Sequence, residues 1–331
     1  MAFGVAVLGT GRIGGRYIDV VKQTNGAELK VVAEPREEQV VDLKVEHTDV
    51  DFVADYHETL ERDDVGVVIG ALPHWLHHQA AIDAVNSGKH VFLEKPMALT
   101  VAQCDEMLAA ARANGKMIMT AHTQRYYPYN RKIKEIIDSK ELGGFVMGRA
   151  FWHKPLNPEL RPEWMLHQDR GGGMGYMDCT HLIDRLIWHL GPDIYSVNGI
   201  TGNYCFPEID ADDTGMHFLR WESGHVAIIS RMAFRTGATD SGGDYYFTDG
   251  QVRVRQGLEN GLWIARGNEL KEIPIDSKED SLHHEFTDFI QALDRGDSDT
   301  PIPMEHGRHV LQVLEATEES NKTGREVILD Y

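Results

Sequence analysis

Asp178, His181 and Asp184 have side chains and a spacing suited to proton transfer. They lie three residues apart in a segment whose pattern predicts a helix, so each carboxylate can reach the imidazole along one helix face. A histidine held by a carboxylate can act as a general base near neutral pH. The spacing therefore predicts a catalytic His181. A surface histidine flanked by two solvated acids is the alternative interpretation.

Lys95 is a second residue placed for chemistry. It lies in Glu94-Lys95-Pro96, directly after the apolar run His90–Leu93, which predicts a short strand. Ligands of open α/β sheets bind beyond the carboxyl ends of parallel strands. A lysine there can orient a substrate hydroxyl and, through its charge, lower the pKa of a nearby acid or base. A solvated loop lysine is the alternative.

The opening segment predicts a dinucleotide-binding turn. An apolar run, Val5–Leu8, leads into a G-x-G-x-x-G motif, and a helical pattern follows at once. The first glycine permits a tight turn, the second lets a pyrophosphate approach the backbone, and the third allows close packing of helix on strand. The helix N-terminus then faces the anion. The residues expected at the cofactor in this turn are Gly9, Gly11, Arg12, Ile13 and Gly14.

Glu34 ends the second predicted strand, Leu29–Ala33, twenty residues beyond Gly14. A carboxylate at this place can accept hydrogen bonds from a ribose diol and repels a 2′-phosphate, so it favours NAD over NADP. Arg36 lies close enough in sequence to bind such a phosphate, which leaves NADP open.

Strands and helices alternate through the first 122 residues. The predicted strands lie at 5–8, 29–33, 52–53, 65–71, 90–93 and 117–121, with helical patterns between them. This alternation predicts a doubly wound parallel sheet, a Rossmann domain over residues 1–122.

Residues 123–331 show a different pattern of predicted elements. The first part contains a helix at 130–138, a strand at 145–153, a Pro-rich loop at 154–170 and a helix at 174–190. The rest contains strands at 194–200, 214–221, 225–232, 245–247, 251–255 and 262–265, and then helices at 282–293 and 305–321. We expect an α+β domain with a large, mostly antiparallel sheet. A sheet of this size commonly packs against a partner, so we expect a homo-oligomer, a dimer or a tetramer.

Composition excludes several classes of partner. The 331 residues suggest two domains at about 150 residues each. With 52 acidic residues against 33 Lys and Arg, a net charge of −19 disfavours nucleic acid and anionic membranes. The first apolar run is too short for a signal peptide or a membrane span. Cys104, Cys179 and Cys205 are odd in number and without a CxxC, which predicts free thiols and a cytoplasmic protein.

Four motifs together resemble the Gfo/Idh/MocA family: the glycine turn with Glu34, the stretch Ala71-Leu72-Pro73 up to His77, the EKP at 94–96, and the GGG…H-x-x-D run at 171–184. That family contains glucose–fructose oxidoreductase, inositol dehydrogenase and many sugar dehydrogenases. The resemblance covers the whole chain. It implies two domains, nicotinamide bound at the sheet edge, and a catalytic cleft between the domains.

The resemblance assigns roles to individual residues. Lys95 matches the EKP lysine of the family and His181 its catalytic histidine. Pro73 and His77 match positions near the nicotinamide, and Arg125 matches an arginine that follows the sixth strand.

Asp178 departs from the family pattern. Family members often carry an aspartate four residues before the histidine, but Met177 stands there and the aspartate is at 178. A shift of one residue rotates a side chain by ~100° on an α-helix. Either Asp178 still has a catalytic or substrate role, or Asp184 orients His181.

The expected site combines these assignments. The cofactor-binding residues outside the glycine turn are Glu34, Arg36, Leu72, Pro73, His77, Glu94 and Lys95. The substrate-binding residues are Lys95, Arg125, Tyr126, Trp152, Trp164, Asp178 and His181, with His153, His167 and Arg170 as further polar side chains nearby. Such aromatic and polar groups suit a sugar, a cyclitol or a glycoside, although tryptophans also serve domain cores. His74, His77 and His78 lack a carboxylate or thiol to complete a set, so we expect no metal.

The expected activity is an NAD-dependent dehydrogenase that oxidises a secondary hydroxyl. His181 takes the hydroxyl proton, and Lys95 holds the oxygen on which negative charge develops. Two alternatives remain: a hydrolase or lyase that uses tightly bound NAD transiently, and a non-catalytic NAD-binding regulator. The presence of both Lys95 and His181 argues against the regulator.

Overall fold

The computed structural model describes residues 2–276 and 280–330. The chain forms two compact units: Met1–Thr123 with Asp280–Arg308, and Gln124–Glu279 with His309–Tyr331. The first unit is therefore built from two separate segments. Helix α8 (Ser281–Arg295) belongs to it, and the His283 ring lies 3.3 Å from the carbonyl oxygen of Gln23 at the end of α1 (Gly14–Gln23).

The first unit contains a parallel sheet of six strands in the order β3-β2-β1-β4-β5-β6. Its central strands are almost entirely apolar because both faces are covered; Val5 and Val67, for example, are fully buried. This confirms the predicted Rossmann sheet. The strands are β1 (Phe3–Leu8), β2 (Ala27–Ala33), β3 (Asp51–Val53), β4 (Val67–Gly70), β5 (His90–Leu93) and β6 (Ile118–Thr120).

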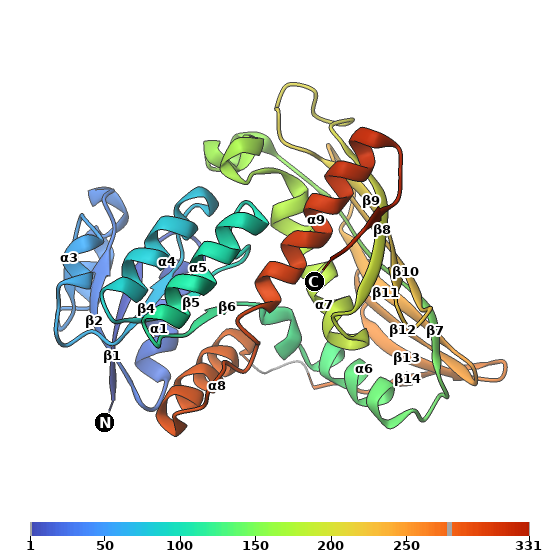
Figure 1. Cartoon of the computed structure of the whole chain (residues 1–331), viewed down its shortest axis with the longest axis horizontal. Coiled ribbons are helices and arrows are strands. Elements are labelled where there is room, and N and C mark those ends of the chain that lie inside the picture. Colours follow the sequence, from blue (N-terminus) through green and yellow to red (C-terminus); the bar gives the residue numbers. More distant parts are fainter. Residues whose placement is uncertain (1, 277–279, 331) are drawn as a thin grey trace. The chain divides into compact units, whose positions relative to one another are not determined.

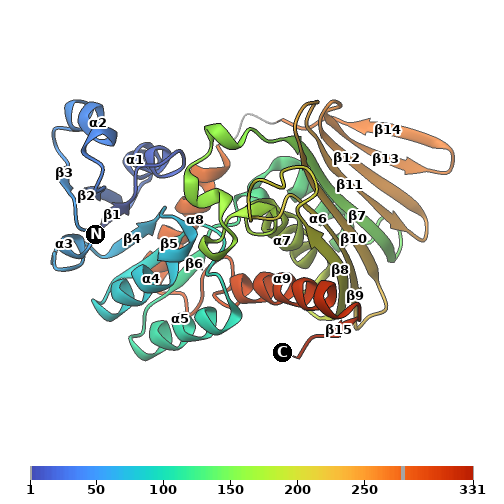
Figure 2. The same ribbon diagram turned by 90° about the horizontal axis from the view of Figure 1, so that it is seen from above.

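Helices cover both faces of this sheet. Helices α1 and α8 pack together on one face, where Phe286 and Phe289 of α8 contact Phe92 of β5. Helices α4 (His77–Asn86) and α5 (Val101–Ala113) pack together on the other (Figure 2). Two short helices, α2 (Val41–Glu46) and α3 (His57–Leu60), lie near β2 and the edge strand β3.

The second unit contains nine strands in the order β14-β13-β12-β11-β7-β10-β9-β8-β15. All neighbours are antiparallel except β7 and β10, which confirms the predicted mostly antiparallel sheet. The strands are β7 (Phe145–Pro155), β8 (Ile194–Gly202), β9 (Thr214–Trp221), β10 (Val226–Phe234), β11 (Asp240–Phe247), β12 (Gly250–Gly257), β13 (Gly261–Arg266), β14 (Glu269–Ile273) and β15 (Val327–Ile328).

Two details of this sheet differ from the sequence prediction. Strand β7 continues to Pro155, so Lys154 lies on a strand and not in the predicted loop. The loop prediction failed there because Pro155 pairs with Phe234 at the strand end. Strands β14 and β15 were not predicted, since β14 is mostly charged and exposed and β15 has only two residues.

Helices cover one face of the nine-stranded sheet. They are α6 (Pro128–Ser139), α7 (Thr180–Leu190) and the second-unit part of α9 (His306–Thr323), as Figures 1 and 2 show. His189 of α7 lies 3.1 Å from the Tyr245 hydroxyl, and Thr317 of α9 lies 2.8 Å from His217. No helix of residues 124–276 or 309–330 covers the opposite face.

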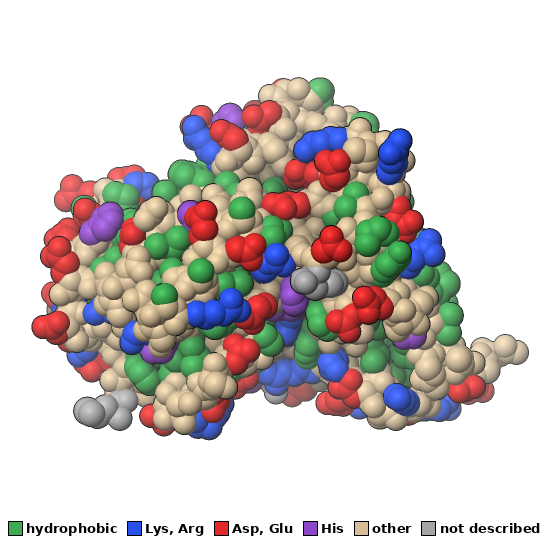
Figure 3. All heavy atoms as spheres, viewed as in Figure 1, with side chains coloured by type: hydrophobic (Ala, Val, Ile, Leu, Met, Phe, Trp, Pro, Cys, Tyr) green, Lys and Arg blue, Asp and Glu red, His purple; other side chains and the backbone are tan. Residues whose placement is uncertain are grey.

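Acidic side chains are spread over the surface in Figure 3, with Lys and Arg between them, as the net charge of −19 leads one to expect. Within residues 2–276 and 280–330, no helix combines the length and apolarity that a membrane crossing needs. The three cysteines are free thiols, as predicted.

Candidate functional site

The glycine turn after β1 has the geometry that its sequence predicts. Gly9 has a φ of +87°, and an added Cβ would lie 2.6 Å from the carbonyl oxygen of Ala71. A Cβ on Gly14 would lie 2.0 Å from the carbonyl oxygen of Gly9. A Cβ on Gly11 would meet nothing within 4 Å. Packing therefore requires glycine at 9 and 14, whereas Gly11 leaves the space in front of the turn open.

This open space fits the pyrophosphate of a dinucleotide. Helix α1 begins at Gly14, and the first N–H groups of an α-helix have no partner within the helix. Arg12 is exposed at the turn and Ile13 is half-buried. The strand order reverses between β1 and β4, which is where doubly wound sheets bind ligands.

Glu34 lies beside the glycine turn, with its side chain almost fully buried. One oxygen accepts hydrogen bonds from the N–H of Thr10 at 2.9 Å and from its hydroxyl at 3.0 Å. Arg36 donates to both carboxylate oxygens, from Nε at 2.7 Å and from NH2 at 2.8 Å. Burial by itself raises the pKa of Glu34, but the hydrogen bonds from Arg36 and Thr10 outweigh it and hold the pKa at about 2. Glu34 is thus ionised and Arg36 covers it.

The segment after β4 lies on the other side of the same turn. Leu72 and Pro73 are half-buried there, whereas His77 is fully buried. The His77 ring nitrogens lie 2.7 Å from the carbonyl oxygen of Pro96 and 2.9 Å from that of Leu72. Burial lowers the pKa of His77 to about 4, against the opposing effect of the two carbonyl oxygens. His77 therefore ties the loop after β4 to the segment after β5; its place near the nicotinamide stays a prediction.

Glu94 and Lys95 follow β5 at the carboxyl edge of the sheet, and both are half-buried. The Tyr17 hydroxyl donates to Glu94 Oε1 at 2.8 Å, and the N–H of Lys95 lies 3.3 Å from Oε2. Burial raises the pKa of Glu94, against the charge of Lys95. The glutamate thus fixes the backbone of Lys95 against α1, and the lysine side chain follows the strand where a ligand is expected.

The helix that carries His181 begins near residue 174, as predicted, but its first part is not regular α-helix. Gly175–Cys179 form one turn of π-helix, and α7 runs from Thr180 to Leu190. A π turn closes with i→i+5 hydrogen bonds and holds more residues than an α turn, so α-helical spacing does not give the direction of Asp178. This local geometry affects the one position at which the sequence departs from the family pattern.

Asp178 points to the sheet, where two cations hold it. Lys154 Nζ of β7 lies 2.8 Å from Asp178 Oδ1, and Arg231 Nε of β10 lies 3.2 Å from Oδ2. Arg231 is fully buried and also donates to the carbonyl oxygen of Asp213 at 3.0 Å. Sequence reasoning missed Lys154 and Arg231, which lie 24 and 53 residues from Asp178. Side chains alternate between the two faces of a strand, so Lys154 lies on the same face of β7 as Trp152. This alternation was the sequence signal that could have identified Lys154.

His181 lies against the same strand. Its ring centroid is 6.1 Å from that of Trp152, and Lys154 Nζ lies 4.6 Å from the Trp152 ring centroid. The structure therefore links His181, Trp152, Lys154 and Asp178 through these contacts; their part in substrate binding stays a prediction.

Other predicted substrate residues are already engaged. Arg125 Nε donates to Asp184 Oδ1 at 2.7 Å, and both side chains are buried. Tyr126 is buried, and the guanidinium carbon of Arg131 lies 4.8 Å from its ring centroid. Trp164 is half-buried.

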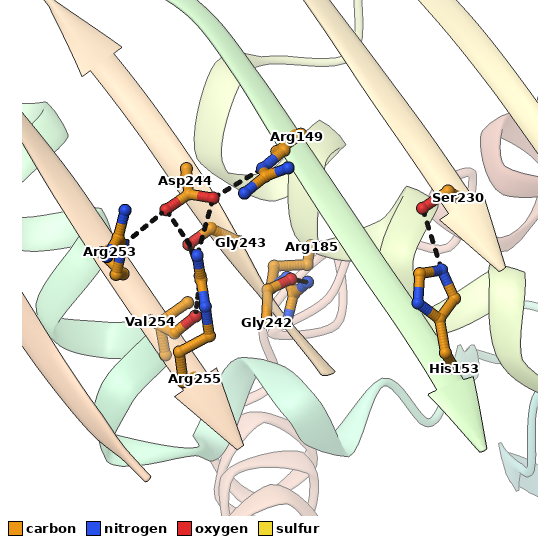
Figure 4. Close-up of polar contacts among 10 residues, drawn as sticks. All are labelled: Arg149, His153, Arg185, Ser230, Gly242, Gly243, Asp244, Arg253, Val254 and Arg255. Carbon is orange, nitrogen blue, oxygen red and sulfur yellow. Dashed lines mark hydrogen bonds and ion pairs between the residues drawn. The ribbon is translucent and has the colours of Figure 1, made fainter. Parts of the chain in front are cut away.

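His153 contacts the Ser230 hydroxyl at 3.1 Å (Figure 4). It is adjacent to Trp152 on β7 and so lies on the opposite sheet face. His167 lies 3.5 Å from Asp210, and Arg170 is exposed.

The glycines at 171–173 pack against their own chain. A Cβ on Gly172 would lie 2.5 Å from the carbonyl oxygen of Met165, and one on Gly173 would lie 2.3 Å from Asp212 Oδ1. These two positions require glycine because of Met165 and Asp212. Contacts within the chain therefore explain both glycines without a ligand.

Comparison with known proteins agrees with this arrangement. A family model described as the oxidoreductase family with an NAD-binding Rossmann fold matches residues 3–122, and the GFO/IDH/MocA C-terminal domain matches residues 130–253. The chain is 28% identical to a 4-carboxy-2-hydroxymuconate-6-semialdehyde dehydrogenase of Sphingobium sp., over 88% of this chain and 90% of that one. It is 31% identical to the inositol 2-dehydrogenase of Salmonella typhimurium, over 60% of this chain and 57% of that one.

A solved structure of levoglucosan dehydrogenase in complex with NADH has the same fold. It superposes with a TM-score of 0.89 at 20% identity and covers all of both chains. The two domain matches together span more than half of the residues, with the nucleotide-binding turn inside the first. The chain is thus an NAD(P)-dependent oxidoreductase and belongs to the Gfo/Idh/MocA family.

Proposed function

We propose that this protein oxidises a secondary hydroxyl of a sugar, cyclitol or glycoside, with NAD as the hydride acceptor. The observation that carries the proposal is the placement of Lys95 at the carboxyl end of β5, in the same sheet as the glycine turn. His181 at the start of α7 supplies the base. The family membership and the inositol and levoglucosan dehydrogenases among similar proteins support this class of substrate.

The chain's own residues carry the proton chemistry. Lys95 donates a hydrogen bond to the substrate hydroxyl oxygen and stabilises the negative charge that develops there. His181 accepts the hydroxyl proton, with its ring oriented by the neighbouring Trp152. The bound nicotinamide supplies the acceptor for the hydride.

Asp178 has a different part in this proposal. Lys154 and Arg231 already hold its carboxylate from two sides. We infer that Asp178 holds Lys154 in place and can still contact a substrate hydroxyl. Proton transfer remains with His181.

We propose NAD as the preferred cofactor. Glu34 neutralises Arg36, so the pair offers no net positive charge to a 2′-phosphate. The ribose diol of NAD needs no such charge, because it donates hydrogen bonds to the Glu34 oxygens once Arg36 turns away.

We also propose that the open face of the nine-stranded sheet binds a second copy of the chain. Five large apolar side chains on this face are 37–48% exposed, which is unusual for a surface that stays in water. Strand pairing places them on one face, since Tyr246 pairs with Met147, Ile228 with Arg149, Met216 with Ser230 and Ile200 with Met216. The five are Met147, Ile200, Met216, Ile228 and Tyr246.

A charged cluster lies beside these apolar side chains. The buried carboxylate of Asp244 accepts hydrogen bonds from Arg149, Arg253 and Arg255, at 2.6, 3.1 and 2.9 Å (Figure 4). Three cations against one anion leave two positive charges, which an acidic second copy would balance. Light scattering on Met216→Glu, compared with wild type, tests this interface: we expect a smaller particle for the variant.

A screen of NADH formation at 340 nm tests the activity itself. We expect turnover with members of a panel of free sugars, inositols and glycosides. Lys95→Ala and His181→Ala should each lower kcat by at least about 100-fold while NAD affinity, measured by fluorescence titration, stays nearly intact. Substrate consumption without net NADH would point instead to transient use of bound NAD. Unchanged activity in both variants would overturn the roles given to Lys95 and His181, and NAD binding without turnover of any compound would return the protein to the class of NAD-binding regulators.

A further inference from the structure

A small pocket lies within the second unit, beside the Asp178 cluster. The space in it that no atom fills is about 360 Å³, a figure that includes open solvent. Its charged lining comes from Lys154, Arg161 and Asp212, and much of the rest is apolar, with three methionines: Met165, Met174 and Met177. Neither Arg161 nor Asp212 belongs to any site that the sequence predicted.

Arg161 is the unusual member of this lining. Within residues 2–276 and 280–330, its guanidinium makes no hydrogen bond or ion pair, although it is only half exposed. Lys154 is close enough for the two charges to repel. Burial lowers the pKa of Lys154 and the nearby Arg161 lowers it further, against the opposing effect of Asp178. Asp178 already offsets the charge of Lys154, whereas no carboxylate of the described residues pairs with Arg161.

The lining itself carries an excess positive charge. Lys154 and Arg161 contribute two positive charges and Asp212 one negative charge, which leaves +1. Behind the lining, NH2 of the buried Arg231, which holds Asp178, has no hydrogen-bond partner among the described residues. A buried donor without a partner is rare in native proteins.

We propose that this pocket binds a carboxylate of the substrate, so that the physiological substrate is an acid and not a neutral polyol. The inference rests on the proposed dehydrogenase function and names its substrate class more closely. Arg161 and Lys154 bind the carboxylate oxygens, in the fork geometry that guanidinium groups favour. The methionines contact the carbon skeleton next to the acid group, since their flexible side chains fit irregular apolar surfaces.

A carboxylate fits better than a phosphate. The excess of one positive charge balances one negative charge, whereas a phosphate monoester carries close to two at neutral pH. Asp212 lies in the same lining and would repel the second charge.

Paired substrates and one set of variants test the proposal. The probes are glucuronate with glucose, galacturonate with galactose, and glucose 6-phosphate. We expect the wild type to favour the acid of each pair by at least about 10-fold in kcat/KM, and the phosphate to behave like the neutral sugar. Arg161→Gln should raise KM for the acids roughly 10- to 100-fold and leave kcat and the neutral sugars nearly unchanged. Arg161→Lys should recover part of the loss.

Arg266→Gln is the matched control. Arg266 is an exposed arginine of the same unit, paired with Glu141, and its loss removes one positive charge away from the pocket. Binding of each acid to the NADH-loaded protein, measured by calorimetry, gives a readout that does not need turnover.

The outcomes separate the two proposals. If no compound gives NADH, the dehydrogenase function is overturned. The pocket is still supported in that case if the acids bind to the wild type and Arg161→Gln abolishes this binding. Equal kcat/KM for acid and neutral partners overturns the pocket, as does an Arg161→Gln effect no larger than that of Arg266→Gln. Preference for glucose 6-phosphate over glucuronate overturns the choice of a carboxylate.

Discussion

Arg36 holds both oxygens of the Glu34 carboxylate, from Nε at 2.7 Å and from NH2 at 2.8 Å. Glu34 also accepts two hydrogen bonds from Thr10, so the residue that the sequence assigns to the ribose is already saturated. The arginine is the more mobile partner, since its side chain is 53% exposed and that of Glu34 is 1% exposed. Cofactor choice therefore depends on this pair and not on Glu34 alone.

Substitution of Glu34 and substitution of Arg36 should shift the preference between NADH and NADPH in opposite directions. Glu34→Gln leaves Arg36 with an unbalanced charge, so we expect NADPH affinity to rise about 10-fold relative to NADH. Arg36→Gln frees the Glu34 oxygens for the ribose diol, so NADH should bind more tightly and NADPH more weakly. Fluorescence titration with both nucleotides measures the ratio. A ratio unchanged by Glu34→Gln would contradict this account.

Two alanine substitutions in the glycine turn should have different effects. Gly14→Ala places a Cβ 2.0 Å from the carbonyl oxygen of Gly9, so we expect loss of several degrees in Tm. Gly11→Ala meets nothing within 4 Å and should leave Tm unchanged. Its methyl group occupies the space for the pyrophosphate, however, so NADH affinity should fall at least about 10-fold. Thermal unfolding of the apoprotein and nucleotide titration separate the two; equal losses of Tm would refute the distinction.

Removal of Asp178 should destabilise the second unit. Asp178→Ala leaves Lys154 and Arg231 without their shared carboxylate, and breaking a buried ion pair from one side costs about 3–5 kcal/mol. Asp178→Asn keeps the shape but not the charge and should lose less. Urea unfolding measures both variants. The surface substitution Asp138→Ala, which breaks an exposed pair with Lys134, is the control and should change stability by less than about 1 kcal/mol. Equal effects at 178 and 138 would be evidence against a buried cluster.

Acid should destabilise the fold through its buried histidines. Burial lowers the pKa of His189 to about 3 and that of His217 to about 4, below the usual value of about 6.5. Below pH 6.5 the unfolded chain then binds more protons than the folded one, so stability falls as the pH decreases towards 4. Each such histidine contributes a slope of up to about 1.4 kcal/mol per pH unit.

His189→Gln should flatten this slope, and His57→Gln, at an exposed site, should not. The slopes must be compared between variants because two buried carboxyls have the opposite effect on stability. Burial raises the pKa of Glu94 and raises that of Asp212 to about 6, so these groups stabilise the folded chain as the pH decreases. Chemical unfolding at a series of pH values between 4.5 and 7 gives the slopes. Parallel curves for wild type and His189→Gln would count against the assignment.

The sequence by itself determined the features that local patterns carry. Gly9, Gly11 and Gly14 sit between an apolar strand and a helix, and this order alone predicts the nucleotide turn. The alternation of strands and helices predicts the parallel sheet, and the short turns between later strands predict the antiparallel one. These signals lie within a few residues of each other, so no knowledge of distant contacts is needed to interpret them.

Only the tertiary structure decided which distant side chains meet. Lys154, Asp178 and Arg231 come together because β7 and β10 are neighbours and the π turn packs on their face, and strand order does not follow from local pattern. Only the structure shows that the guanidinium of Arg161 lines a pocket and has no ion pair among the described residues. Even the pair Glu34 and Arg36, two residues apart, needed the structure, because the direction of each side chain depends on the backbone beyond β2. The sequence thus determined the cofactor turn, and long-range packing decided the environment of the proposed substrate site.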